Sequence, residues 1–171
     1  VAHCAVEITG GTTVQVEGRT LDLSTPWRRA SLTDLVEEAL GMRVDVRMPV
    51  GEVRAIAVEH GLEPEPSWGS GKILLELYEK HVEHSLWDPV FVIDYPKEVS
   101  PLSRDHRELP EMVERFEAIV AGRELCNAFS ELIDPVEQRA RFEDQVRQRE
   151  AGDAEAGEAL SHRVRRPVRR A

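Results

Sequence analysis

The stretch from Glu114 to Leu132 decides the fold, and it reads Glu-Arg-Phe-Glu-Ala-Ile-Val-Ala-Gly-Arg-Glu-Leu-Cys-Asn-Ala-Phe-Ser-Glu-Leu. Two strand-like runs flank the dipeptide Ala121-Gly122, which predicts strands over 114–120 and 123–132 joined by a two-residue turn. Glycine adopts the positive φ that such a turn requires without a steric penalty. We therefore expect an antiparallel hairpin here.

The sequence on either side of the hairpin predicts the remaining elements of an α+β fold. Ser31 and Asp34 form a capping box that begins a helix, and Asp134, Pro135 and Glu137 supply the N-cap, the first-turn proline and the capping-box acid of another. Together the patterns predict an antiparallel β-sheet with flanking helices. The expected elements are an antiparallel meander at 4–8, 12–16 and 20–23, helices at 32–40, 53–60, 73–82 and 135–150, and a buried strand at 89–95.

Composition limits the class of protein. The chain has 171 residues, of which 41% are hydrophobic and 32% charged, which fits one domain or a piece of a larger one. No run approaches the ~20 apolar residues of a membrane span, so we expect no membrane role. Two cysteines, Cys4 and Cys126, are too few for a disulfide framework, and the start has no secretory pattern, which favours the cytoplasm.

The charge is distributed unevenly along the chain. The net charge is -10, yet residues 157–171 contain five arginines. An acidic body argues against nonspecific coating of nucleic acid and leaves open a site for a cation. We expect the arginine-rich tail, 157–171, to be a separate disordered segment.

Two acids of the hairpin are candidate metal ligands. In a regular hairpin with a two-residue turn, Glu117 and Glu124 are diagonal neighbours on one face, roughly 7–8 Å apart at the backbone. Mg²⁺ commonly takes one or two protein carboxylates and leaves its other positions to water and phosphates. A solvated strand face is the alternative, since exposed acids are common.

A second set of polar and aromatic residues follows on the same strand. Asn127, Phe129 and Glu131 alternate by two and so project to one side, as a site for a small cationic ligand would require. A regular pleat places Glu124 on the opposite face, whereas one β-bulge between Glu124 and Asn127 would bring all of them into one pocket. Alternatively, Phe129 is a core residue and Glu131 an acid at the end of the strand.

Two other motifs are interpreted as structural. Gly69-Ser70-Gly71-Lys72 resembles a phosphate-binding loop but lacks its spacing and its preceding strand. His81 and His84 stand three apart on one predicted helix, but no third metal ligand accompanies them.

Three stretches of this sequence resemble the lysine-type class II aminoacyl-tRNA synthetases. They are Glu98–Leu102, Arg115–Glu117, and Gly122–Leu132 running into Asp134-Pro135 and Gln138. The resemblance implies that residues 1–156 form part of a class II catalytic domain.

The resemblance also assigns roles to the candidate residues. It implies that Glu117 and Glu124 bind the Mg²⁺ that accompanies ATP, and that Glu124 contributes to the ATP site. Asn127 matches a residue that helps hold the amino-acid carboxylate, and Phe129 matches a wall of the pocket. Glu131 matches the acid that receives the lysine ε-ammonium, which physical chemistry supports because a buried ammonium needs an anionic partner.

The implied reaction joins lysine to ATP as lysyl-adenylate and then transfers lysine to tRNA, in a full-length enzyme that we expect to be a homodimer. The sequence offers no candidate for the anticodon-binding barrel or for the three class II motifs, so we expect this chain alone not to complete catalysis. Two alternatives stay open. One is a paralogue that charges lysine onto a protein or lipid-linked acceptor, and the other is an inactive module that binds lysine or ATP.

Overall fold

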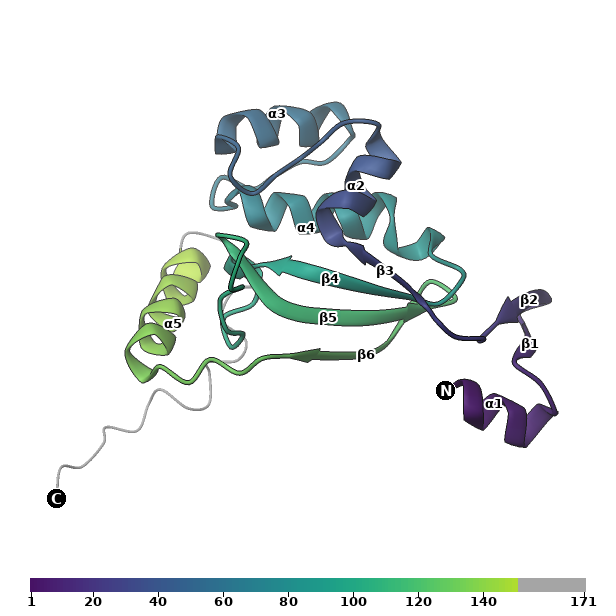
Figure 1. The fold of residues 1–171 in the computed structure, drawn as a ribbon. Helices are drawn as coiled ribbons and strands as arrows, with labels where there is room; N and C mark the ends of the chain where they lie inside the picture. The colour runs from purple at the N-terminus through teal and green to yellow at the C-terminus, as the bar shows by residue number, and fades with distance from the viewer. Residues whose placement is uncertain (151–171) are drawn as a thin grey trace, which may run out of the picture.

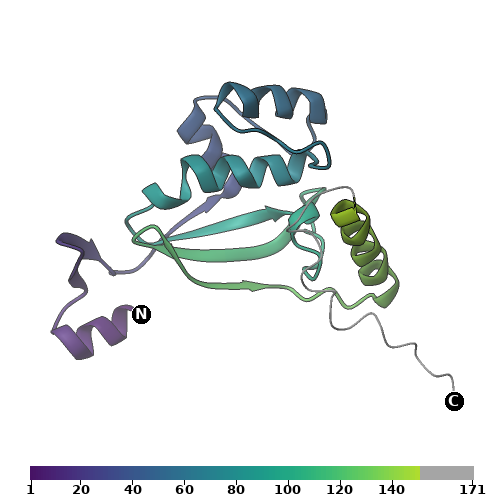
Figure 2. The ribbon, with the colours of Figure 1, turned by 180° about the vertical axis from the view of Figure 1, so that it is seen from behind.

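The computed structural model describes residues 1–150 (Figure 1). The predicted arginine-rich tail, 157–171, lies outside the described residues. A layer of helices packs on a β-sheet, with a small N-terminal unit at one end of the sheet and the last helix at the other. The views in Figures 1 and 2 agree on this arrangement.

A four-stranded sheet forms the centre of the fold. Its order is β3-β4-β5-β6, where β3 is Arg28–Ser31, β4 is Val90–Pro96, β5 is Met112–Val120 and β6 is Arg123–Phe129. Strands β4, β5 and β6 are antiparallel, which confirms the predicted hairpin and the predicted buried strand. Strand β3 runs parallel to β4 and was not expected, because its sequence, Arg-Arg-Ala-Ser, has almost no apolar content.

Three predicted helices lie on the same side of the sheet, where the first and the last contact the strands and the middle one packs on the last. They are α2 (Leu32–Leu40), α3 (Val50–Glu59) and α4 (Ser70–His81). The Ser31 hydroxyl accepts a hydrogen bond from the Asp34 backbone N–H at 3.0 Å, so the predicted N-cap is present. Leucines and valines of these helices pack against Val92, Val113 and Ile119 of the sheet in one core. None of the helices within residues 1–150 is both long and apolar enough to cross a membrane.

The N-terminal unit corrects one prediction. Residues 4–8 lie in a helix, α1 (Ala2–Thr9), and not in the first strand of a meander. Gly10 ends this helix with a φ of 83° and donates its N–H to the Val6 carbonyl. The other two strands are present as β1 (Thr13–Val16) and β2 (Arg19–Asp22), which form an antiparallel pair. A run of five mostly apolar residues is too short to distinguish a strand from one face of a helix.

The start of α4 is bound by a carboxylate from the same chain. Glu98, in the short 3₁₀ helix η2 (Lys97–Val99), accepts hydrogen bonds from the backbone N–H groups of Gly69, Gly71 and Lys72 at 2.8, 3.0 and 3.2 Å. A Cβ at Gly69 would lie 2.6 Å from this carboxylate, and one at Gly71 would lie 2.9 Å from Pro96 Cβ. Close packing therefore requires glycine at position 71, whereas a side chain at position 69 would displace the Glu98 carboxylate. The interpretation that this motif is no phosphate loop agrees with the contact.

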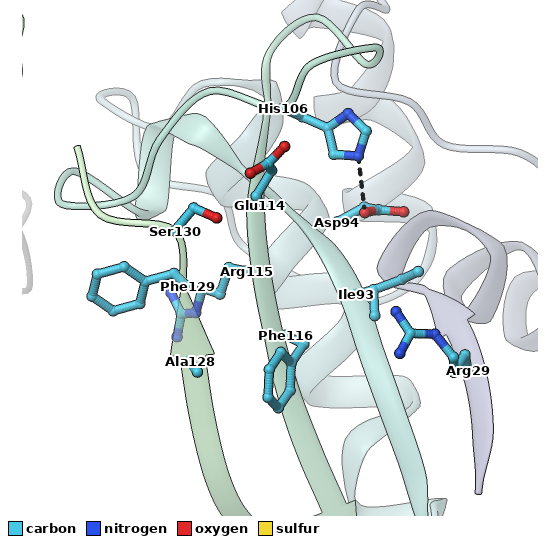
Figure 3. A pocket seen from close by; sticks show the side chains of 10 residues that line it. All are labelled: Arg29, Ile93, Asp94, His106, Glu114, Arg115, Phe116, Ala128, Phe129 and Ser130. Atoms are coloured by element: carbon cyan, nitrogen blue, oxygen red, sulfur yellow. Dashed lines mark ion pairs between the residues drawn. The ribbon is translucent and has the colours of Figure 1, made fainter. Parts of the chain in front are cut away.

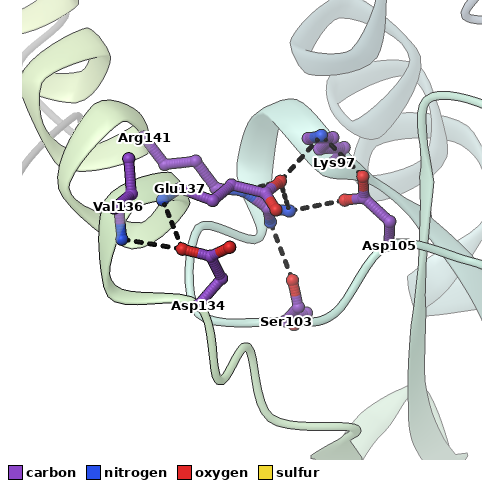
Figure 4. Close-up of polar contacts among 7 residues, drawn as sticks. All are labelled: Lys97, Ser103, Asp105, Asp134, Val136, Glu137 and Arg141. Carbon is purple, nitrogen blue, oxygen red and sulfur yellow. Dashed lines mark hydrogen bonds and ion pairs between the residues drawn. The ribbon is translucent and has the colours of Figure 1, made fainter.

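The last helix, α5 (Pro135–Glu150), begins where predicted. Asp134 accepts from the backbone N–H groups of Val136 at 2.8 Å and Glu137 at 3.2 Å (Figure 4). The Glu137 carboxylate does not complete a capping box but accepts from Lys97 and Arg141. Arg141 is the buried residue of this very polar helix, so ionic contacts, more than apolar burial, attach α5.

We predict that Glu98→Ala lowers the free energy of unfolding by about 1–3 kcal/mol, because it leaves three N–H donors at the start of α4 without their acceptor. Urea denaturation followed by circular dichroism measures the change. Glu63→Ala is the matched control, since Glu63 is exposed and should change stability by no more than about 0.5 kcal/mol. Equal losses in the two variants would contradict a special role for Glu98.

Candidate active site on the β5–β6 hairpin

The turn of the hairpin is fixed against a neighbouring segment. Ala121 and Gly122 have φ values of 54° and 68°, as a two-residue hairpin turn requires. Their N–H groups donate to the carbonyls of Trp87 and Leu86 at 2.9 and 2.8 Å. A Cβ at position 122 would lie 2.9 Å from the His84 carbonyl oxygen, so only glycine fits there. The contact places the 3₁₀ helix η1 (Glu83–Ser85) beside the hairpin.

A β-bulge interrupts the ladder between Glu124 and Asn127. Glu124 lies opposite Ile119, but Ala118 lies opposite Cys126, so Leu125 is the extra residue. Asn127 consequently lies opposite Glu117, whereas in a ladder without the bulge it would lie opposite Phe116. The bulge on which the predicted single pocket depended is thus present. It moves the side chains after Leu125 to the opposite face from the one they would have in a regular strand, so Asn127 shares a face with Glu124.

The bulge brings most of the predicted site residues to one face. Glu117 and Asn127 are a cross-strand pair, and the Asn127 Nδ2 donates to Glu124 Oε1 at 2.6 Å. Phe129 lies opposite Arg115 and continues the same face. Glu117 is buried at 8% exposure, whereas Glu124 and Asn127 are exposed. The face is covered by helices over β5 and is open over β6.

Glu131, the last of the predicted site residues, lies beyond the end of β6, so a loop determines its position. It forms an isolated antiparallel bridge with Ser103, and the N–H of the next residue, Leu132, donates to the Leu102 carbonyl at 2.9 Å. Its side chain is exposed. The structure brings Glu117, Glu124 and Asn127 together, and Glu131 stands at the far end of the same strand.

Arg115 balances part of the negative charge at Glu117. Its guanidinium donates to the Glu117 carboxylate and, at 3.0 Å, to the Ser100 hydroxyl, and it stacks 4.6 Å from the centre of the Tyr95 ring. Burial raises the pKa of Tyr95 and of Tyr78, and the nearby Glu117 carboxylate raises both further. Both phenols are therefore neutral beside the carboxylate at physiological pH.

A third carboxylate, Glu83, was missed by the sequence reasoning. Burial raises its pKa first, and the negative charges of Glu117 and Glu124 raise it further. Its place in η1 depends on the docking of the hairpin turn, which is a contact between distant segments. An acid next to a predicted helix end carries no signal of that contact.

The donor chemistry of the site fits a divalent cation held jointly with phosphates. Within residues 1–150 no group of three or more histidine, cysteine, aspartate or glutamate side chains is arranged to hold a metal ion. Glu117 and Glu124 offer carboxylate oxygens, which Mg²⁺ prefers, and Mg²⁺ usually completes its shell with water and substrate phosphates. Among the described residues, only Arg115 forms an ion pair with either of these two acids. A bound cation would neutralise the negative charge that Arg115 leaves.

A cavity of about 350 Å³ opens on the opposite face of the sheet (Figure 3). Ile93, Phe116 and Ala128 line it, and these three residues lie opposite one another across β4, β5 and β6, one position away from Glu117. Polar residues border it, among them Asp94 and His106, whose Oδ1 and Nε2 atoms are 3.5 Å apart. Its lining also includes Arg115 and Phe129, but neither Glu117 nor Glu124 lines it.

The sequence matches a known protein family over most of its length. The family model described as tRNA synthetases class II (D, K and N) matches residues 1–163. The chain belongs to the class II tRNA synthetases. The α+β fold and the antiparallel hairpin predicted from the sequence agree with that membership.

Several relatives are named lysine–tRNA ligase. The chain is 46% identical to that of Synechococcus sp. (strain CC9902) over 157 residues, 45% to that of Moorella thermoacetica over 156, and 42% to that of Bacillus subtilis (strain 168) over 156. Each match covers 91% of this chain and 31%, 32% and 31% of the relative, respectively. The chain thus spans about a third of the length of these relatives.

We predict that deleting Leu125 leaves the site intact, because the deletion converts the bulge into a regular ladder with Asn127 still opposite Glu117. Stability in urea should stay within about 1 kcal/mol of the parent chain. Nuclear Overhauser contacts between residues 117 and 127 report the pairing. Deleting Ala128 is the contrast, since it should turn Phe129 and Glu131 to the opposite face. Loss of the 117–127 contact on deleting Leu125 would show that Leu125 is not the extra residue of the bulge.

Proposed function

We propose that residues 1–156 are part of the catalytic domain of a lysine–tRNA ligase and that the β5–β6 face binds lysine and ATP. The bulge carries this proposal, because it places Glu124, Asn127 and Phe129 on one face with Glu117 and directs the strand towards Glu131. The names of the relatives support lysine as the amino acid. In this proposal the Glu131 carboxylate pairs with the lysine ε-ammonium.

The proposed reaction makes an adenylate and then an ester. A carboxylate oxygen of lysine attacks the α-phosphorus of ATP, the bond from that phosphorus to the bridging oxygen breaks, and pyrophosphate leaves. The terminal ribose hydroxyl of tRNA then attacks the lysyl carbonyl and AMP leaves. Positioning and charge stabilisation contribute most to such phosphorus chemistry, and proton transfer by the protein contributes little.

Each residue of the face has a proposed part in that first step. Glu117 and Glu124 hold Mg²⁺ with ATP, and Glu124 thereby contributes to the nucleotide site. Bound Mg²⁺ neutralises phosphate charge. Asn127 offers an amide N–H to the lysine carboxylate, and Phe129 forms an apolar wall along the lysine side chain. Glu131 selects a cationic side chain, since a site built for an ammonium rejects analogues that lack it.

The proposal extends to the partners and the location of the protein. We propose lysine, ATP and tRNA as its substrates, a homodimer as the assembly of the full-length enzyme, and the cytoplasm as its location. The two cysteines, Cys4 and Cys126, are free thiols in the structure, which supports a reducing compartment.

We predict that the chain binds lysine and that Glu131→Gln weakens this binding at least about tenfold, because an amide cannot replace the charge that pairs with the ammonium. Isothermal titration calorimetry measures lysine and, as an uncharged comparison, norleucine. Glu143→Gln is the control, because Glu143 is an exposed glutamate on α5 and should not affect either ligand. If Glu131→Gln binds lysine as tightly as the parent chain, Glu131 is not the partner of the ammonium.

We predict that ATP binding depends on Mg²⁺ through Glu117 and Glu124. Removing Mg²⁺ with EDTA should weaken ATP binding by the parent chain, and Glu124→Gln should reduce the effect of Mg²⁺ because one carboxylate ligand is lost. Fluorescence titration with a labelled ATP analogue measures both effects. Glu114→Gln is the control, since Glu114 lies on β5 but on the face away from Glu117. An equal Mg²⁺ effect in the parent chain and Glu124→Gln would remove Glu124 from the metal site.

A further inference from the structure

One buried arginine stands between the last helix and the loop that holds Glu131. Arg141 has 8% of its surface exposed although α5 is otherwise polar and open to solvent. Burying a guanidinium is costly unless its donors are satisfied. The acceptors of the Arg141 guanidinium hydrogen bonds therefore show which segments its burial connects.

The guanidinium bonds to the loop and to its own helix at once (Figure 4). Its Nη1 donates to the Ser103 carbonyl at 2.7 Å, in a buried contact, and its Nη2 donates to Asp105 Oδ1 at 2.5 Å. Glu137, one helical turn earlier, accepts from Nη2 and Nε. Lys97 bridges Asp105 and Glu137 at 2.8 and 3.1 Å, which closes a ring of alternating charges.

The same loop residue pairs with Glu131. Ser103 and Glu131 form an antiparallel bridge, and the hydrogen bonds on either side of it run from Arg104 N to Ser130 O at 2.7 Å and from Leu132 N to Leu102 O at 2.9 Å. Strand β6 ends at Phe129, so these bonds hold the backbone of Glu131. Arg141 thus contacts, through one carbonyl, the segment that places Glu131.

We propose that Arg141 is a positioning residue for lysine recognition, which acts by holding Ser103 and, through the Ser103–Glu131 bridge, the carboxylate that pairs with the ammonium. This inference rests on the proposed lysine site. The planar fork of arginine reaches the Ser103 carbonyl and the Asp105 carboxylate together, which a lysine ammonium on a flexible stem does less well. The alternative is that Arg141 only attaches α5.

The first test measures ligand selectivity. In Arg141→Met, which keeps an unbranched apolar stem, the ratio of lysine to norleucine affinity should fall at least about tenfold, a difference of 1.4 kcal/mol. Arg141→Lys should show a smaller fall, and Arg139→Met, an exposed arginine of the same helix, should show none. If Arg141 acts through Glu131, the double variant with Glu131→Gln should be no less selective than Glu131→Gln alone. Unchanged selectivity in Arg141→Met, or additive losses in the double variant, would overturn the proposal.

The second test separates this inference from the proposed function. Amide hydrogen exchange on the unliganded chain should be at least about tenfold faster at Arg104 and Leu132 in Arg141→Met, while amides of the α4 core keep their protection. If the parent chain does not bind lysine, the proposed function fails, yet this measurement still reports whether Arg141 holds the segment of Glu131. Unchanged exchange at both amides would overturn the positioning role, and Arg141→Lys supplies the same measurement if Arg141→Met does not fold.

Discussion

The carboxylate of Glu98 at the N-terminus of α4 is the contact on which both halves of the fold depend. Three backbone N–H groups donate to it, and glycines at 69 and 71 let the two segments approach closely. A helix N-terminus attracts an anion, and here the chain supplies that anion itself. The contact fixes the beginning of the loop that runs on to Ser103 and Asp105. Beyond the apolar core, this cap links the helical layer to the loop that reaches the far end of β6.

The hairpin end of the site is fixed by a different means. The turn donates two backbone hydrogen bonds to the segment after η1, which brings Glu83 near Glu117 and Glu124. Like charges in such proximity destabilise a fold, and proteins tolerate this mainly where function requires it. Arg115 compensates only part of the charge. An acidic, partly buried face to which, within residues 1–150, only Arg115 is bonded as a cation fits a site that binds a metal ion with anionic phosphates.

Local sequence signals predicted the individual helices and strands well, but they predicted the contacts between these elements poorly. The turn at Ala121-Gly122, the cap at Ser31 and the cap at Asp134 each depend on residues within four positions, and the structure contains all three. Strand β3 was missed because pairing with β4, not its own sequence, makes it a strand. The bulge could be stated only as a condition, since one inserted residue leaves no mark in the alternation. Glu83 and Arg141 were missed because their partners are distant in sequence. The spacing of Glu137 and Arg141, one helical turn apart, was the available signal.

The polar attachment of α5 has a consequence that an apolar contact would not have. Apolar surfaces attract without direction, so the register of a helix held by them depends only on how well its side chains interlock. The ring of Arg141, Asp105, Lys97 and Glu137 is directional, because each bond requires a particular distance and angle. Net stabilisation by such ion pairs is small, as desolvation offsets much of their attraction. What they provide is a fixed register between α5 and the loop. A carboxylate that must meet an ammonium benefits from that register more than from added stability, since small displacements weaken a charge-assisted hydrogen bond steeply.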